Sequence, residues 1–162
     1  KILYETKFIF IAAMNPCPCG NLLSSVKECR CNELEIQRYK NRLSEPFLDR
    51  IDLYLVMNDS FNDNKNIVNS NELHENVIKA FIKQKTRGQK ELNGKLSDED
   101  IKKYCILDEE SLIILEKARL NYNLTFRSIN KVLKVARTIA DLNDNEIITK
   151  NDLLQSLNFR RR

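Results

Sequence analysis

The chain has 162 residues, of which 42% are hydrophobic and 31% are charged, and its net charge is +4. This length corresponds to one globular domain or to about one and a half, and the composition is ordinary, with enough apolar residues to build a core. They exclude a membrane-spanning helix, because no apolar run approaches the roughly 18 residues that a span requires. The charge is compatible with nucleic-acid binding without arguing for it, and the absence of a signal-peptide pattern leads us to expect a cytoplasmic protein.

The first distinctive stretch is the apolar run FIFIAAM at residues 8–14. It follows a short mixed lead-in at residues 1–7, which is abrupt for a domain start, so we expect the chain to be part of a longer protein. A continuous β-branched and aromatic run predicts a strand buried on both faces of a parallel sheet. Asn15 follows this run, at the carboxyl end of the predicted strand. Side chains at that end face the ligand crevice of such sheets. Asn15 is therefore a candidate to bind a substrate, a water or a phosphate, and the alternative is that Asn15 and Pro16 only start a turn.

Four cysteines come next, in two C-x-C pairs formed by Cys17 with Cys19 and by Cys29 with Cys31. Four thiolates in a short polar loop suit a tetrahedral zinc ion in a closed structural site. The alternatives are free reduced thiols and two disulfides, although a reducing compartment favours metal over disulfides. The spacing within each pair is one residue, closer than the roughly two to four of the usual zinc knuckle. Cys105 stands alone in a helical context, which predicts a core thiol.

Residues 33–43 have helical periodicity, with Asn32 and Glu35 placed as a capping box. A second strand is predicted at 52–57, directly after Arg50. Arg50 is either an ion-pair partner of Asp49 and Asp52 or a cation directed at an anion. The segment 58–70 is rich in Asn and Asp and predicts a linker.

The remaining residues predict helices. The expected ranges are 71–89, a short helix opened by Ser97 with Asp100 in the capping-box position, a helix from Asp108 to Tyr122, a helix over 126–142 capped by Thr125, and one over 149–158 capped by Thr149. Arg127 lies in the first turn of the helix over 126–142, where a cation opposes the helix dipole. It therefore needs a compensating anion, which is either a nearby carboxylate or a bound phosphate.

Several longer blocks resemble the magnesium-chelatase-like AAA+ ATPases of the ComM/YifB type. These are AAMNPCPCG at 12–20, CRC at 29–31, QRYKNRLSEPFLDRIDL at 37–53, KKYCILDEE at 102–110 and RSINKVLKVARTIADL at 127–142. The resemblance implies the C-terminal part of the ATPase module and an α/β plus all-α fold. Residues 1–57 would be the C-terminal strands of a P-loop AAA+ core with a Cys-rich insertion at 17–31. Residues 58–70 would be a linker, and residues 71–162 a helical-bundle lid.

The resemblance also implies roles for single residues. Asn15 resembles the sensor-1 residue, which orients water at the terminal phosphate of the nucleotide. Arg50 resembles the arginine finger presented to the nucleotide of a neighbouring subunit, and Arg127 resembles the sensor-2 arginine of the lid. The implied ligands are ATP and Mg²⁺, beside the zinc expected at the cysteines. The implied partners are further copies in a homo-oligomer, expected to be a hexamer, and DNA, remodelled in recombination or transformation.

One part of the family pattern is missing from these residues. The sequence has no G-x-x-x-x-G-K-[ST] motif and no Walker-B acidic strand before Phe8. In the family both lie upstream, so we do not expect this chain to hydrolyse ATP by itself. A different class of function also fits the cysteine loop, namely a non-catalytic, zinc-stapled adaptor that binds nucleic acid or protein.

Overall fold

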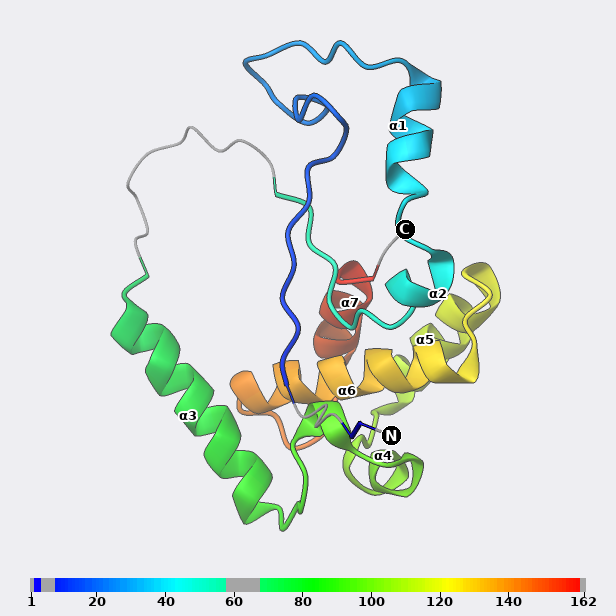
Figure 1. Cartoon of the computed structure of the whole chain (residues 1–162). Coiled ribbons are helices and arrows are strands. Elements are labelled where there is room, and N and C mark those ends of the chain that lie inside the picture. Colours follow the sequence, from blue (N-terminus) through cyan, green and yellow to red (C-terminus); the bar gives the residue numbers. More distant parts are fainter. Residues whose placement is uncertain (1, 4–7, 58–67, 161–162) are drawn as a thin grey trace. The chain divides into compact units, whose positions relative to one another are not determined.

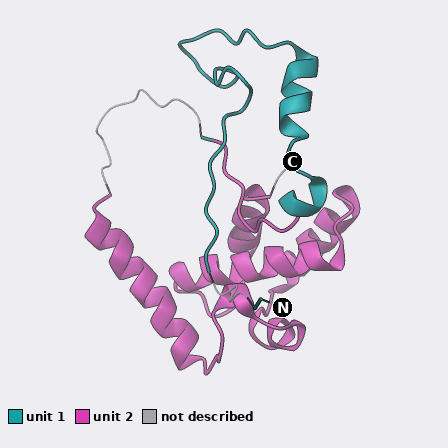
Figure 2. Ribbon diagram, in the orientation of Figure 1, with its two compact units in different colours: residues 1–48, 57–62 teal, residues 49–56, 63–162 magenta. Residues whose placement is uncertain are grey.

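The computed structural model describes residues 2–3, 8–57 and 68–160 (Figure 1). The chain divides into two compact units (Figure 2). Unit 1 comprises residues 1–48 and 57–62, and unit 2 comprises residues 49–56 and 63–162. The predicted domain boundaries at 57 and 70 stay predictions.

The described part of unit 1 contains the helices α1 (Glu33–Lys40) and α2 (Glu45–Leu48). The predicted capping box of α1 is confirmed, because Asn32 Oδ1 accepts from the Glu35 N–H and Glu35 Oε2 accepts from the Asn32 N–H. The helix ends at Lys40, short of the predicted end at residue 43. Helix α2 was not predicted. Proline is tolerated in a first helical turn, where its missing N–H would have no partner in any case.

The predicted fold class is wrong in its α/β part, because neither expected strand is formed. Within the described residues the only strand-like pairing is an isolated parallel bridge between Leu107 and Ile148. Residues 8–14 are unpaired and their side chains are exposed, with Ile9 and Ile11 each 89% accessible. Residues 52–57 are likewise outside any strand. Apolar, β-branched composition favours a strand only where a second strand supplies hydrogen-bond partners, and the described part of the chain supplies none.

Unit 2 is helical, as expected. Its elements are α3 (Ser70–Thr86), the 3₁₀ turn η1 (Asn93–Lys95), α4 (Asp98–Tyr104), α5 (Glu109–Asn121), α6 (Phe126–Leu142) and α7 (Lys150–Asn158). The predicted caps Ser97, Asp108 and Thr125 are confirmed, since each side chain accepts the backbone N–H three residues later. Capping supplies partners to N–H groups that the helix itself leaves unsatisfied. Among the described helices of unit 2, the ends of α3 and the η1 turn differ from expectation.

The core of unit 2 forms around α6, against which α3, η1, α4 and α7 pack. The apolar stripe predicted for α6 is buried, as expected for a helix whose apolar residues recur at helical spacing. The cluster consists of Leu96, Ile101, Cys105, Leu115, Val132, Leu133, Ala136, Ala140, Ile148 and Leu153. Cys105 is 6% exposed, which confirms the predicted core thiol. Packing against the core therefore fixes α6, the helix that carries Arg127.

Candidate functional site

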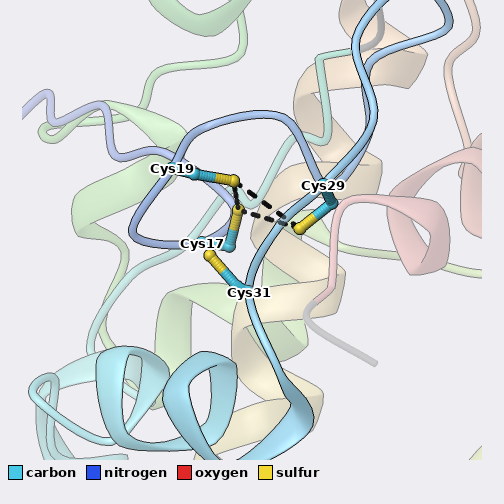
Figure 3. Close-up of side chains that lie close together, drawn as sticks. All are labelled: Cys17, Cys19, Cys29 and Cys31. Carbon is cyan, nitrogen blue, oxygen red and sulfur yellow. Dashed lines mark hydrogen bonds between the residues drawn. The ribbon is translucent and has the colours of Figure 1, made fainter.

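The four clustered cysteines of unit 1 bring their sulfur atoms together. All four sulfurs lie within 4.8 Å of one another, and Figure 3 shows the side chains pointing toward a common centre. The distance between Sγ atoms is 3.5 Å for Cys17 and Cys19, 3.7 Å for Cys17 and Cys29, and 3.6 Å for Cys19 and Cys29. A tetrahedral zinc ion with bonds of about 2.3 Å places its sulfurs about 3.8 Å apart. The thiols are free rather than disulfide-bonded, so this cluster can hold a metal ion.

The backbone around Gly20 shapes this loop. The Gly20 N–H donates to the Cys17 carbonyl at 3.0 Å, and Gly20 has a φ of +81°. That left-handed conformation is strained for any residue with a Cβ, so glycine allows the chain to turn back immediately after Cys19. Cys17 is then fully buried, while Cys19 stays exposed. The tight turn explains how a C-x-C pair can direct both of its sulfurs to one point.

Hydrogen bonds distribute charge unevenly over the cluster. The backbone N–H groups of Asn21 and Arg30 lower the pKa of Cys19 to about 6. A backbone hydrogen bond from Cys19 favours the Cys31 thiolate, but burial and the neighbouring thiols outweigh it and raise the pKa of Cys31 to about 12. The pKa of Cys29 is also raised, by burial and the same neighbours, against a stabilising backbone bond from Cys31. Four thiolates at this distance repel one another, and a divalent cation among them removes that repulsion.

Asn15 lies beside the cysteine loop. A Cβ built on Gly20 would be 3.7 Å from Asn15 Nδ2, so the amide sits against the turn that follows Cys19. Asn15 itself is exposed, which leaves the amide accessible to a ligand. The structure thus groups Asn15 with the cysteines in unit 1, whereas Arg50 and Arg127 belong to unit 2.

The backbone beside Arg50 is tied to α6. Lys131 Nζ donates to the Asp49 carbonyl, lies 3.5 Å from the Ile51 carbonyl and lies 3.6 Å from Asp52 Oδ1. A second bond holds the other end of this segment, from the Tyr54 N–H to the Phe159 carbonyl at 2.7 Å. Arg50 is exposed. It is thereby presented at the surface of unit 2 from a backbone with two anchors.

Arg127 is the second residue of α6 and is exposed. The first turn of α6 contains no acidic residue, and among the described residues Arg127 forms no ion pair. The nearby carboxylate that would have neutralised it is therefore not found in the described part of the chain. A cation left at the positive end of a helix is a suitable group for an external anion.

A buried charged cluster in unit 2 was missed from the sequence. Asp141 accepts from Arg87, from Arg137 and from Asn93, and all of these donors come from α6 or from the α3–η1 connection. Arg137, Asn93 and Asp141 are 0–2% exposed. The only local signal was an arginine four residues before an aspartate on one helix face. Arg87, at the end of α3, is partly exposed, whereas the other members of the cluster are buried, so the role of the cluster is to hold α3 on α6.

None of the helices in the described part of the chain is long and apolar enough to cross a membrane.

Comparison with known proteins identifies the relatives of this chain. Residues 1–65 match the family model described as magnesium chelatase, subunit ChlI, and residues 68–160 match the model of the ChlI C-terminal region. Over 165 residues the chain is 36% identical to the uncharacterized protein YifB of Escherichia coli and 35% identical to the competence protein ComM of Haemophilus influenzae. It is 23% identical over 163 residues to Rv2897c of Mycobacterium tuberculosis.

The first two matches cover 99% of this chain and 32% of each relative, so the chain spans about a third of their length. The two family models divide the chain between residues 65 and 68 and together account for nearly all of it. Both the family models and the level of identity lead to the same assignment. The chain belongs to the magnesium-chelatase-like family, in the group that includes YifB and ComM.

Proposed function

We propose that this chain is the C-terminal portion of the ATPase module of a ring-forming AAA+ motor. In this proposal Arg50 is the arginine finger, Arg127 is the sensor-2 arginine and Asn15 is the sensor-1 residue. The observation that carries it is that Arg50 and Arg127 are both exposed, on a segment and a helix that Lys131 joins directly. An exposed guanidinium group suits a polyanion such as the triphosphate of ATP.

The chemistry assigns each side chain a task. Phosphoryl transfer spreads negative charge over the oxygens of the terminal phosphate, so catalysis depends on positioned cations and an oriented water. Arg50 and Arg127 would supply the cations, and both stay charged at every ordinary pH. The amide of Asn15 would orient the water. The cradle for ATP and Mg²⁺ would come from the rest of the longer protein, because the sequence lacks a Walker-A motif.

The test uses Arg50→Ala in the intact protein. We expect steady-state ATP hydrolysis to fall by about 10³- to 10⁵-fold, as for other arginine fingers, with nucleotide binding largely retained. Arg119→Ala is the matched control, since Arg119 is an exposed arginine of α5 whose partner is Glu116. Because the finger acts on the neighbouring subunit, mixing Arg50→Ala with a Walker-A variant should restore some activity. Normal hydrolysis by Arg50→Ala contradicts the proposal.

We further propose that the cysteine cluster binds one Zn²⁺ per chain through Cys17, Cys19, Cys29 and Cys31. The near-tetrahedral sulfur spacing supports this assignment, and four protein ligands leave no open position for catalysis. Bound zinc would supply a structural cross-link for a loop that has too few apolar residues to fold by itself. Elemental analysis of protein purified under reducing conditions tests this directly. Finding no metal would discard the zinc site.

For the whole protein we propose a homo-oligomer, a hexamer in the simplest case, that remodels DNA in recombination or transformation. The named relative ComM, a competence protein, supports this direction. The second candidate function is a non-catalytic, zinc-stapled adaptor for nucleic acid or protein, which the cysteine loop favours. ATP hydrolysis that depends on Arg50 separates the two, because the adaptor needs none.

A further inference from the structure

Lys131 holds the backbone on both sides of Arg50. Its ammonium group bonds the carbonyls of Asp49 and Ile51, the residues before and after Arg50, and it also faces Asp52. The Lys131 side chain is 20% exposed and that of Asp52 is 66% exposed, so the ammonium group is only partly shielded from water. An ammonium group has three donors, which is the number needed for two carbonyls and one carboxylate.

The same lysine lies close to Arg127. Four residues separate the two on α6, a rise of about 6 Å along the axis, and side chains at that spacing share one face of a helix. Helix α6 is rigid, because its opposite face is packed into the core through Val132, Leu133 and Ala136. Any displacement of the first turn of α6 therefore moves Lys131, and with it the carbonyls on either side of Arg50.

We propose that Lys131 is a positioning residue that couples Arg50 to the ligand state of Arg127. This inference rests on the proposed function, in which both arginines contact ATP. An anion that draws Arg127 toward it shifts α6, and Lys131 transmits the shift to the segment that presents Arg50. Since the finger serves the nucleotide of the neighbouring subunit, this side chain passes information from one active site of the ring to the next.

A second hydrogen bond holds the far end of the segment that contains Arg50, so a shift of Lys131 acts on only one end of it. The Tyr54 N–H is bonded to the Phe159 carbonyl, at the end of α7, so the far end of the segment is held independently of Lys131. Movement at the Lys131 end therefore changes the direction of Arg50 instead of carrying the whole segment along. Arg50 lies at the Lys131 anchor itself, so it is redirected when that anchor moves relative to the one at Tyr54.

The test compares three variants of the intact protein in steady-state ATP hydrolysis. Lys131→Met keeps the apolar stem and removes the donors, and Lys131→Arg keeps a charged donor. Lys134→Met is the matched control, because Lys134 is on the same helix and lies 3.5 Å from the Gly94 carbonyl, away from the Arg50 segment. We expect Lys131→Met to lower kcat by about 10- to 100-fold, the range for a misplaced catalytic group, at unchanged KM for ATP. Lys131→Arg should recover most of the loss, and Lys134→Met should match the parent protein.

A double variant and a second substitution complete the test. Adding Lys131→Met to Arg50→Ala should cause no further loss in single-turnover rate, because the lysine acts only through Arg50. Should Lys131→Met lower the melting temperature more than Lys134→Met, Asp52→Asn replaces it. Asp52 is 66% exposed, and its amide variant weakens the Lys131 contact from the other side. A several-fold fall in kcat is then expected at an unchanged melting temperature.

Two outcomes overturn the coupling by itself. One is a kcat for both Lys131→Met and Asp52→Asn equal to that of Lys134→Met, and the other is an additive loss in the double variant. Normal hydrolysis by Arg50→Ala alone is a different result, since it overturns the proposed function from which the coupling follows.

Discussion

Arg137 and Asp141 face each other across one turn of α6, with 2.9 Å between Arg137 Nη2 and Asp141 Oδ1, and neither side chain is exposed to solvent. Arg137 also donates to the carbonyls of Glu146 and Asn145, at 2.7 and 2.6 Å. The guanidinium therefore connects α6 to the loop that leads into α7. A buried pair of this kind contributes little compared with apolar packing, but it becomes very unfavourable when one partner is removed.

We predict that Asp141→Ala lowers the free energy of unfolding by about 3–5 kcal/mol, because it leaves the Arg137 guanidinium buried without a counter-charge. Urea denaturation followed by circular dichroism measures this. Asp144→Asn is the control, since Asp144 is 88% exposed, pairs with Lys83 at the surface and has a positive φ that asparagine tolerates. Loss of an exposed pair should change stability by less than about 1 kcal/mol. Equal effects of the two variants would show that the buried pair is not a stability determinant.

Asp152 should make the stability of unit 2 depend on pH. Burial raises its pKa, but bonds from Asn143, Thr149 and Asn145 outweigh burial, so that the folded-state pKa is lowered. A carboxyl with a lowered pKa stabilises the fold above its unfolded pKa of about 3.9, and this contribution is lost as pH falls through the folded value. We expect Asp152→Asn to cost about 1.5–3 kcal/mol at pH 7, as for other charge-assisted hydrogen bonds.

The difference in the free energy of unfolding between Asp152→Asn and the parent protein should become smaller below about pH 4. Thermal unfolding followed from pH 7 to pH 2.5 records it. Asp100→Asn is the comparison, since Asp100 occupies the same position of α4, is partly exposed and accepts a hydrogen bond from Ser97. A difference that stays constant over the whole pH range would exclude a role for the Asp152 charge.

Replacing a cysteine of the cluster should remove the metal. Cys31→Ser takes away one of four ligands, so we expect zinc content to fall from one per chain to near zero and the loop to lose its cross-link. A chelator should lower the melting temperature of the parent protein and leave that of Cys31→Ser unchanged. Cys105→Ser is the control, because this core thiol lies outside the cluster. It should lower stability while the zinc content stays at one, and a fall in zinc there would question the assignment of ligands.

Arg127 should affect stability and hydrolysis in opposite directions. Its charge opposes the dipole at the start of α6 and has no acidic neighbour in that turn. Arg127→Gln should therefore raise the free energy of unfolding by about 0.3–1 kcal/mol. In the intact protein the same change should raise KM for ATP and lower kcat. Unfolding and hydrolysis measured on one preparation provide the comparison, and a variant that hydrolyses ATP normally would remove Arg127 from the proposed site.

The helices of unit 2 could be predicted because their signals are local. The caps Ser97, Asp108 and Thr125 each act within three residues of sequence, and the apolar spacing of α6 is a property of one segment. The strands at 8–14 and 52–57 were predicted wrongly because strand formation depends on a partner that composition cannot reveal. The cluster at Asp141 was missed for a related reason, since its donors come from two distant segments.

The candidate site likewise has features that the local sequence predicts and features that depend on tertiary structure. The cysteine cluster could be predicted from spacing, because its ligands lie in one short loop. Its turn at Gly20 and the neighbouring position of Asn15 became visible only in the structure. Lys131 carries no motif of its own, and its relation to Arg50 depends on how α6 packs beside residues 49–52.

The bridge between Leu107 and Ile148 has a consequence for the order of folding. These residues precede α5 and α7, and Ile148 bonds the backbone of both Ile106 and Asp108. The chain between them must fold back on itself before the two can meet, and such distant contacts form late because closing a long loop is entropically unfavourable. The late step is then the pairing of residues 106–108 with Ile148, since α7 itself packs mainly on α6, its neighbour in sequence. A chain that has not reached it leaves the core residue Ile148, which is fully buried in the folded protein, uncovered, and is the species most open to proteolysis and self-association.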